Sequence, residues 1–328
     1  MSQATVSRVL SGSPKVHPGT RARVLAALDS TGYVPNQAAR AMRTSRTGAI
    51  GVVVGRITNP FYPELLTALS RELHAAKQRM VLWDSEGPGA QAALDAIRQR
   101  VVDGLVFTTA TRDLPPLRQA LAANAPVVLV NRSVPTLACD QVGSDNVAGG
   151  QLVARYFAAS GHRRCAMICG PRGISTTDER ERGYRAELRA TGQGLRSELV
   201  ARGDYSHPEG HKGMRRLLDR DDPPTAVFCA NDLLAFGAID AARSLGVRVP
   251  GDVWVCGYDD IPMASWEAYE LTTIRQPIDE TAEDAVRRLL ARIADPTLPT
   301  VTHRFPPRLI VRSSTAGAPL APELISPA

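Results

Sequence analysis

The chain has 328 residues, of which 44% are hydrophobic and 22% charged, a composition typical of folded globular proteins rather than disordered ones. This length is sufficient for two or three compact units, each with its own core. The apolar runs, such as those at 49–55 and 125–130, are far too short to cross a membrane, and no secretory signal pattern opens the sequence. These features argue against membrane and secreted proteins, and we expect a cytoplasmic protein with no membrane partner.

The net charge of +6 is concentrated at one end of the chain. Residues 1–47 hold seven of the basic residues and a single acid, Asp29, whereas basic and acidic residues balance in the remainder. Lys and Arg side chains that bind phosphates release counterions, so this end is suited to a polyanionic partner such as nucleic acid. The alternative at this point is a solvated basic tail.

The cysteines predict neither a metal site nor disulfides. They are scattered and form no CxxC pair and no zinc-type spacing: Cys139, Cys165, Cys169, Cys229 and Cys256. An odd number of such residues is typical of reduced thiols in the cytoplasm. We therefore predict no metal and no cofactor.

The basic end predicts short helices. Val6, Val9 and Leu10 repeat at helical spacing, a turn follows at 12–14, and a second apolar stripe runs from Val24 to Leu28. A third short helix is predicted over 36–42, after Pro35.

From Gly48 the pattern alternates between strand and helix. Apolar runs that predict strands lie at 50–54, 80–83, 104–107 and 127–130, and, after Gly161, at 165–169, 200–202, 226–229, 253–257 and 309–312. Helical stretches lie between or after them at 61–77, 90–100, 114–123, 179–190, 208–219, 232–245 and 279–293. Continuous apolar runs indicate strands that are buried on both faces, hence parallel sheets with crossover helices. The predicted fold class is α/β, with two doubly wound parallel-sheet lobes and a ligand cleft at the carboxyl ends of their strands.

A series of short motifs, weak singly, occurs in one order along the chain. They are TVSRVLSG (5–12), GYVPNQAAR (32–40), TNPFY (58–62), GSDN (143–146), GHRR (161–164), RERGY (180–184), AND (230–232), GYDD (257–260) and LTTIRQP (271–277). In this order they resemble the LacI/GalR family of transcription regulators over nearly the whole chain. The resemblance implies a helix-turn-helix head, a hinge helix, and a periplasmic-binding-protein-like body that binds an effector.

The resemblance also implies which head residues contact DNA. Gln3, Ala4 and Arg8 match base-reading positions, since Gln can pair with adenine and Arg with guanine. Phosphate-contacting positions match Thr5, Ser7, Thr20 and Arg21. In the hinge helix, Asn36 and Ala39 are expected to contact DNA, and Met42 matches a leucine that wedges into the minor groove. The alternative for the polar residues is ordinary helix surface, and for Met42 a core contact.

The expected domains are a partial helix-turn-helix at 1–34, a hinge helix and linker at 35–47, an effector domain at 48–315 and a loose tail at 316–328. Within the effector domain, the first lobe is expected at 48–161 plus 276–303 and the second at 162–275 plus 304–315. Family members carry one more helix before the SQAT stretch, where this sequence has Met1. We expect that the start is misplaced; the other interpretation is a product that binds DNA poorly.

For the effector, the resemblance implies a sugar-like molecule bound between the lobes. Arg180 matches a ligand-gripping arginine, and Asn231 and Asp259 match residues that hydrogen-bond sugar hydroxyls. Four further matches complete the expected set: Phe61, Tyr62, Thr176 and Tyr205. For Asp232 and Asp260, two interpretations are equally favoured: contact with the ligand, or a structural role as cap or turn residues.

The rival class is an enzyme. A loose GxGxxA pattern at 87–92 has no acid after the next strand to hold a ribose, and no nucleophile–base pattern occurs. We therefore expect no enzyme. The predicted protein is a homodimeric transcription repressor that binds double-stranded operator DNA, and a small molecule controls its affinity for that DNA. The alternative is a cytoplasmic sugar-binding protein that does not bind DNA.

Overall fold

The structure is a computed structural model, and it describes residues 2–10, 13–32, 46–55, 57–85, 88–111 and 114–315. The chain forms two compact units, Met1–Thr47 and Gly48–Ala328, which are described separately below.

In the first unit, two helices pack together, α1 (Gln3–Leu10) and α2 (Pro18–Thr31). Pro18 occupies the first position of α2, where its missing N–H is not needed, and Gly32 ends the helix in a left-handed conformation with φ 61°. Val9 and Val24 are buried between the helices, whereas Leu25 is 51% exposed. The predicted helix at 36–42 lies outside the described residues.

The first lobe of the second unit is a six-stranded, all-parallel sheet in the order β11-β5-β4-β3-β1-β2. Its strands are β1 (Ala49–Val54), β2 (Arg79–Asp84), β3 (Gly104–Phe107), β4 (Val127–Val130), β5 (Asp140–Ser144) and β11 (Thr302–Phe305). Its helices are α4 (Phe61–Ala75), α5 (Gly89–Arg98), α6 (Pro115–Ala122) and α11 (Ile278–Ala294).

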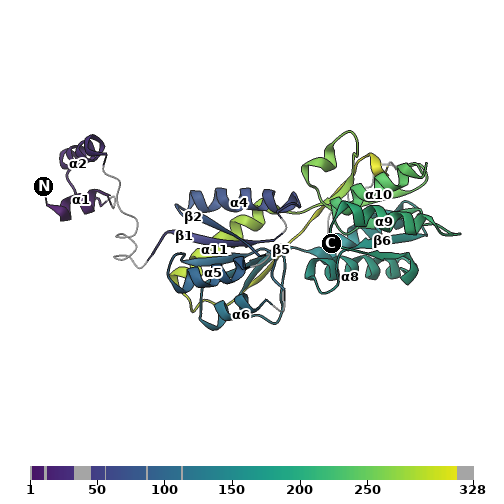
Figure 1. Ribbon diagram of the computed structural model, residues 1–328, viewed down its shortest axis with the longest axis horizontal. Helices are drawn as coiled ribbons and strands as arrows, with labels where there is room; N and C mark the ends of the chain where they lie inside the picture. Colours follow the sequence, from purple (N-terminus) through teal and green to yellow (C-terminus); the bar gives the residue numbers. More distant parts are fainter. Residues whose placement is uncertain are drawn as a thin grey trace. The chain divides into compact units, whose positions relative to one another are not determined.

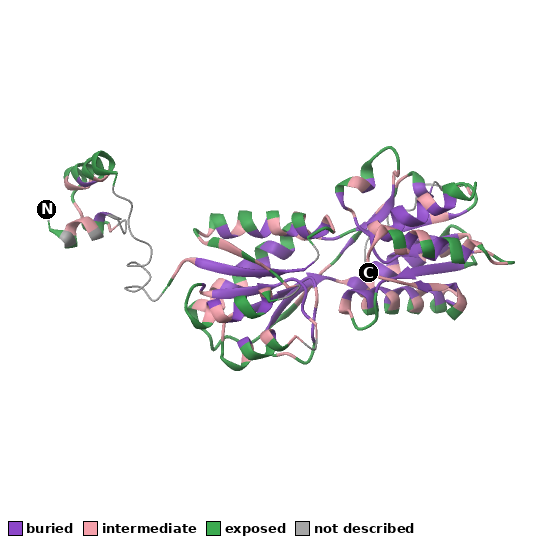
Figure 2. Ribbon diagram, in the orientation of Figure 1, coloured by how far each residue is buried: buried purple, intermediate pink, exposed green. Residues whose placement is uncertain are grey.

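Both faces of the inner strands of this sheet are buried, as the continuous apolar runs predicted, whereas the predicted edge strand β2 is exposed or half-buried along its length. Alternate residues of a strand point to opposite faces, so Ile50 and Val52 of β1 join the core that contains α4 and α11, and Val53 joins the core that contains α5 and α6. Figures 1 and 2 show this sheet as a buried layer with exposed helix faces outside it.

The second lobe is also six-stranded, in the order β12-β10-β9-β8-β6-β7, with only β12 antiparallel. Its strands are β6 (Cys165–Cys169), β7 (Val200–Arg202), β8 (Ala226–Cys229), β9 (Trp254–Asp259), β10 (Thr272–Arg275) and β12 (Arg308–Ile310). Its helices are α7 (Asn146–Ala159), α8 (Ser175–Ala190), α9 (His207–Leu218) and α10 (Asp232–Ser244), with short 3₁₀ turns at Ser197–Leu199, Pro262–Ser265 and Ser313–Thr315. The α/β fold class with two doubly wound lobes is confirmed.

The chain passes between the lobes three times: from β5 to α7, from β10 to α11 and from β11 to β12. The expected boundary after residue 161 was wrong, because α7 packs against α8 of the second lobe. Gly150 and Gly183 allow this close packing, since a Cβ on Gly183 would lie 2.0 Å from the Val147 carbonyl oxygen. The boundary after residue 303 was also too early, because Arg304 and Phe305 still pair with β5 of the first sheet.

Four elements of the body were not predicted: β5, α7, β10 and β11. The sequence of β5, DQVGS, is polar although all five residues are buried. Its polar groups are internally bonded: the Gln141 side chain accepts from the Val134 N–H (2.8 Å), and Asp140 accepts from Arg292 (2.7 Å). A hydropathy pattern cannot reveal a strand whose burial depends on such partners.

None of the helices in the described part of the chain combines the length and apolarity needed to span a bilayer.

Candidate functional site

A cavity of about 180 Å³ lies between the two lobes of the second unit. Its lining comes from loops that follow the carboxyl ends of parallel strands in both sheets, the usual ligand position in doubly wound folds. The lining residues are Thr58, Asn59, Phe61, Tyr62, Asn131, Arg132, Thr176, Arg180, Tyr205, Ser206, His207, Asn231, Leu233, Asp259 and Gln276.

The structure brings together all seven residues that the sequence predicted for effector binding. Phe61 and Tyr62, at the start of α4, contribute from the first lobe. The second lobe contributes the other five: Thr176, Arg180, Tyr205, Asn231 and Asp259. Residues up to about 200 positions apart in sequence therefore share one small cavity.

Arg180 is the most constrained side chain of the cavity. It is 3% exposed, and its guanidinium donates to Asn146 Oδ1 (2.9 Å), to the Ala230 carbonyl (2.5 Å) and to Asp259 Oδ1 (3.5 Å). The guanidinium carbon also lies 3.6 Å from the centroid of the Tyr258 ring, a cation–π contact. Burial, the largest single influence, lowers the pKa of Arg180, but the attraction of Asp259 and the smaller effects of the Tyr258, Tyr205 and Tyr62 phenols together outweigh it, so the net direction of the shift is upward and the group stays charged.

Asp259 is the acidic partner of Arg180 and is itself buried. Burial raises its pKa to about 6, although Arg180 and the Gln276 amide, which donates at 2.7 Å, both favour the charged form. Near neutral pH the cavity therefore contains a buried guanidinium–carboxylate pair. Hydrogen bonds to Asn146 and Ala230 fix the orientation of the guanidinium, and the bond from Gln276 fixes that of the carboxylate.

The phenol of Tyr205 is held by α8, where it bonds the hydroxyls of Thr177 and, at 3.4 Å, Thr176. This fixes the aromatic ring at the edge of the cavity. Ser175, in the same helical turn, instead accepts a hydrogen bond from the Ser133 N–H (3.0 Å).

Three polar atoms of the cavity are buried and have no hydrogen-bond partner among the described residues: Asn131 Oδ1, Arg132 Nε and Asn231 Nδ2. The Asn231 amide orientation is fixed, because its Oδ1 accepts from the Leu234 N–H (2.9 Å) at the start of α10. Each unsatisfied buried group costs about 1–3 kcal/mol. An occupant that supplies both donors and acceptors would remove this cost.

Asn131, Arg132 and Gln276 were missed in the sequence. Asn131 and Arg132 directly follow the buried run 127–130, and polar residues at the end of a parallel strand are a signal that could have identified them. Gln276 lies inside the LTTIRQP motif (271–277), but the motif alone does not show that the Gln276 amide donates a hydrogen bond to Asp259.

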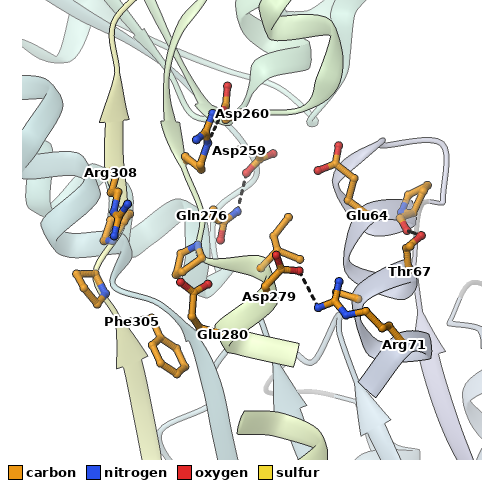
Figure 3. Close-up of a pocket in the computed structure, with 17 residues that line it drawn as sticks. Glu64, Thr67, Arg71, Asp259, Asp260, Gln276, Asp279, Glu280, Phe305 and Arg308 are labelled. Atoms are coloured by element: carbon orange, nitrogen blue, oxygen red, sulfur yellow. Dashed lines mark hydrogen bonds and ion pairs between the residues drawn. The ribbon is translucent and has the colours of Figure 1, made fainter. Parts of the chain in front are cut away.

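A larger hollow of about 1100 Å³ adjoins the cavity and shares Asp259 and Gln276 with it (Figure 3). Two ion pairs lie within its lining: Arg71 with Asp279 (3.0 Å) and Arg275 with Asp260 (2.5 Å). Among the described residues, the larger hollow has a buried unpaired carboxylate oxygen, Glu64 Oε1, which only accepts while it is charged, whereas the smaller cavity brings together two unpaired donors and an acceptor. We therefore take the smaller one as the candidate ligand site.

The open question about Asp232 and Asp260 is resolved in favour of structural roles. The carboxylate of Asp232 accepts from the Ile261 N–H (2.9 Å) and the Thr273 hydroxyl (2.5 Å), and Asp260 pairs with Arg275 and Arg312. Neither residue lines the small cavity.

Within the described ranges, no group of three or more His, Cys, Asp or Glu side chains is arranged to hold a metal ion. In the GxGxxA pattern, Gly89 has a packing role, because a Cβ there would lie 1.7 Å from the Asp84 carbonyl oxygen.

Of the predicted DNA-contacting residues, some lie on α1 and α2 and the others lie outside the described residues. Ala4 and Arg8 are exposed on α1, whereas Thr5 is half-buried and bonds Ser2 (2.9 Å). Thr20 and Arg21 are half-buried at the start of α2, where Arg21 donates to the Ser13 carbonyl (2.5 Å). Gln3 and Ser7 belong to α1, but their side chains are outside the description, as are Asn36, Ala39 and Met42 altogether.

Comparison with known families gives two matches. Residues 1–36 match the family model described as bacterial regulatory proteins, lacI family. Residues 154–315 match a periplasmic binding protein-like domain.

Individual relatives match over almost the whole chain. The HTH-type transcriptional regulator CelR of Thermobifida fusca is 34% identical over 320 residues, covering 95% of this chain and 94% of the relative. The ribose operon repressor of Escherichia coli (strain K12) is 33% identical over 318 residues, covering 96% of each. Both relatives are named as regulators of transcription.

Solved structures show the same likeness. The transcriptional regulator CelR–cellobiose complex has a TM-score of 0.77 at 33% identity, covering 96% of each chain. The lac repressor dimer bound to operator and the anti-inducer ONPF has a TM-score of 0.85 at 26% identity, covering 97% of this chain and 96% of that one.

Proposed function

Since this chain belongs to the lacI family of bacterial regulatory proteins and is a DNA-binding transcription regulator, we propose that a neutral monosaccharide in the cavity between its lobes controls its affinity for DNA. The observation that carries the ligand class is the set of three unpaired polar atoms: two donors, Arg132 Nε and Asn231 Nδ2, and one acceptor, Asn131 Oδ1. Sugar hydroxyls both donate and accept, so one polyhydroxylated ring can satisfy all three.

Charge and size narrow the class further. The lining contains two guanidiniums, those of Arg132 and Arg180. The charge of Arg180 is already balanced by Asp259, so a neutral ligand leaves the Arg180–Asp259 pair intact. The cavity is smaller than the range of about 300–1000 Å³ that is typical of drug-sized ligands. At about 180 Å³ it suits a single sugar ring better than a disaccharide. The aromatic side chains of Phe61, Tyr62 and Tyr205 supply the apolar faces that a sugar ring packs against.

In this proposal, the basic head at the start of the chain binds operator DNA. The basic head would read base edges through Gln3, Ala4 and Arg8, and a homodimer would present two heads to a two-fold-symmetric site. The solved lac repressor dimer on its operator supports this arrangement. Because the partner is chromosomal DNA, the proposed site of action is the cytoplasm.

Calorimetric titration of the full chain with a panel of unmodified aldopentoses and aldohexoses, and with cellobiose, tests the ligand class. We expect a monosaccharide to bind and Arg132→Met to weaken that binding about tenfold or more, a loss of about 1.4 kcal/mol. The variant should lose no more than about 1 kcal/mol of stability, because Arg132 Nε has no partner in the described structure and Nη1 makes one long hydrogen bond, to the Thr109 carbonyl (3.4 Å).

The matched control is Arg189→Met, the same change at an exposed position near the end of α8. It should leave both affinity and unfolding unchanged. Binding of cellobiose alone, or equal loss in both variants, would reject the monosaccharide assignment.

A further inference from the structure

Glu179, the residue before the ligand-gripping Arg180, bonds across the boundary between the lobes. It lies on α8 of the second lobe, yet its Oε1 accepts from Ser133 Oγ at 3.1 Å and from Arg304 Nη2 at 3.4 Å. Ser133 follows β4 and Arg304 belongs to β11, so both donors come from the first lobe. The carboxylate side chain is only 15% exposed.

Its other oxygen connects it to the ligand cavity. Oε2 of Glu179 accepts from Asn146 Nδ2 (3.1 Å), and Oδ1 of the same amide accepts from Arg180 Nε (2.9 Å). Asn146 is 1% exposed and starts α7, directly after the first passage between the lobes. A single amide therefore joins the arginine of the cavity to the carboxylate that binds the opposite lobe.

A backbone bond lies beside this network. The Ser133 N–H donates to Ser175 Oγ (3.0 Å), which is on the first turn of α8. The first lobe therefore contacts the start of α8 through two charge-assisted hydrogen bonds to Glu179, from Ser133 Oγ and Arg304 Nη2, and through one hydrogen bond from the Ser133 backbone N–H. Charge-assisted bonds are the stronger kind, and they are strongest where solvent is excluded.

We propose that Glu179 is a positioning residue that latches the two lobes and couples Arg180 to their relative position. A ligand that draws the Arg180 guanidinium toward itself changes the hydrogen bond to Asn146, and the same amide then changes its hold on Glu179. The contacts from Glu179 to Ser133 and Arg304 transmit this change to the first lobe. The coupling to ligand rests on the proposed function, whereas the latch itself does not.

Hydrogen exchange of the Ser133 amide, measured by mass spectrometry on the full ligand-free chain, tests the latch. In Glu179→Gln we expect this amide to exchange about tenfold faster or more, the factor that corresponds to the loss of one charge-assisted hydrogen bond. The Val134 amide bonds Gln141 within the first lobe and should be unaffected. Ser133→Ala, a milder change, should accelerate exchange at its own amide by a smaller factor, and it provides the test should Glu179→Gln fail to fold.

Glu187→Gln is the matched control. Glu187 lies on the same helix, and its 14%-exposed side chain pairs with Arg155 (3.1 Å) of α7, so this ion pair stays within one lobe. Exchange at Ser133 should not change in this variant. Unaltered exchange in Glu179→Gln, or equal acceleration in both variants, would refute the latch.

A second arm adds D-ribose to the wild type and to Glu179→Gln. Slower exchange at Ser133 in the wild type but not in the variant supports the coupling to the cavity, and equal slowing in both overturns that coupling. If D-ribose binds neither, the panel sugar that binds the wild type by calorimetry takes its place, and only failure of the whole panel rejects the ligand assignment. The ligand-free comparison does not depend on the occupant.

Discussion

Glu64 shows how a single side chain can make the stability of the body depend on pH. It lies on α4 and points into the larger hollow, which Asp259 and Asp260 enter from the opposite lobe (Figure 3). Arg71, Arg275, Arg308, Asp279 and Glu280 also line this hollow. Burial, and then the charges of Asp259 and Asp260, raise the pKa of Glu64 to about 7.

A raised carboxyl pKa stabilises the folded chain at low pH and loses this effect as pH rises. The contribution of Glu64 to the free energy of unfolding should therefore be present below about pH 4.5 and disappear between that value and about pH 7. In Glu64→Gln this component is removed. The difference in unfolding free energy between wild type and variant, measured in urea, should shift against the wild type from pH 5 to pH 8.

Asp259 has the same sign of shift, and the part that comes from its own burial is common to both proteins and cancels; only its repulsion with Glu64 belongs to the difference. Glu280→Gln, which removes an exposed carboxylate at the same hollow, controls for loss of charge. A wild-type-to-variant difference that stays constant from pH 5 to pH 8 would contradict the assignment to Glu64.

At the scale of elements, the contact between α7 and α8 positions Arg180. A Cβ on Gly183 would lie 2.0 Å from the Val147 carbonyl oxygen, and one on Gly150 would lie 2.2 Å from the Arg180 carbonyl oxygen. Both clashes are with backbone, which cannot rotate away as a side chain can. The two helices therefore approach closely only where both have glycine.

Gly183→Ala should force these helices apart and lower the free energy of unfolding by about 1–3 kcal/mol, the usual cost of overpacking. Gly194→Ala provides the control, because a Cβ at Gly194 would meet no atom within 4 Å. Equilibrium denaturation in urea measures both. If the two variants are equally stable, the close helix contact does not constrain the second lobe.

The same elements show what a sequence can and cannot predict. The runs that became β1, β3, β4, β6 and β8 are continuously apolar, and both faces of each are buried, so hydropathy alone identified them. The strand β5 is as deeply buried, but through side-chain hydrogen bonds and the Asp140–Arg292 pair, which involve residues 152 positions apart. Pairings at that separation are not visible in a local pattern.

The cavity follows the same division. Its predicted residues lie in motifs of the family, and the structure places them together. Asn131 and Arg132 were not predicted because their importance depends on one unpaired atom in each, Asn131 Oδ1 and Arg132 Nε, which only the packed structure shows. The lobe boundary was misjudged for a related reason: α7 is assigned to a lobe by its contact with α8, and not by its own sequence.

For the molecule as a whole, the distribution of charge separates two tasks. The first 47 residues hold the entire net charge of +6, and the remainder is neutral, as suits a body that binds a neutral solute. Phosphate contacts release counterions, so DNA affinity should depend steeply on salt, whereas sugar affinity should not. Arg8 and Arg21 both belong to the charged head but are expected to act differently.

Arg21→Ala removes a predicted phosphate contact. It should weaken binding to operator and random duplexes alike and reduce the slope of log affinity against log salt by about 0.9. Arg8→Ala removes a predicted base contact and should cost about 1–3 kcal/mol on the preferred sequence with little effect on random DNA. Fluorescence anisotropy of labelled duplexes across a salt series measures both, with Arg216→Ala on the exposed face of α9 as the control. If Arg8→Ala and Arg21→Ala alter specificity and salt slope identically, the division between base reading and phosphate contact within the head is wrong; if Arg216→Ala matches them, the charge of the head does not carry the binding.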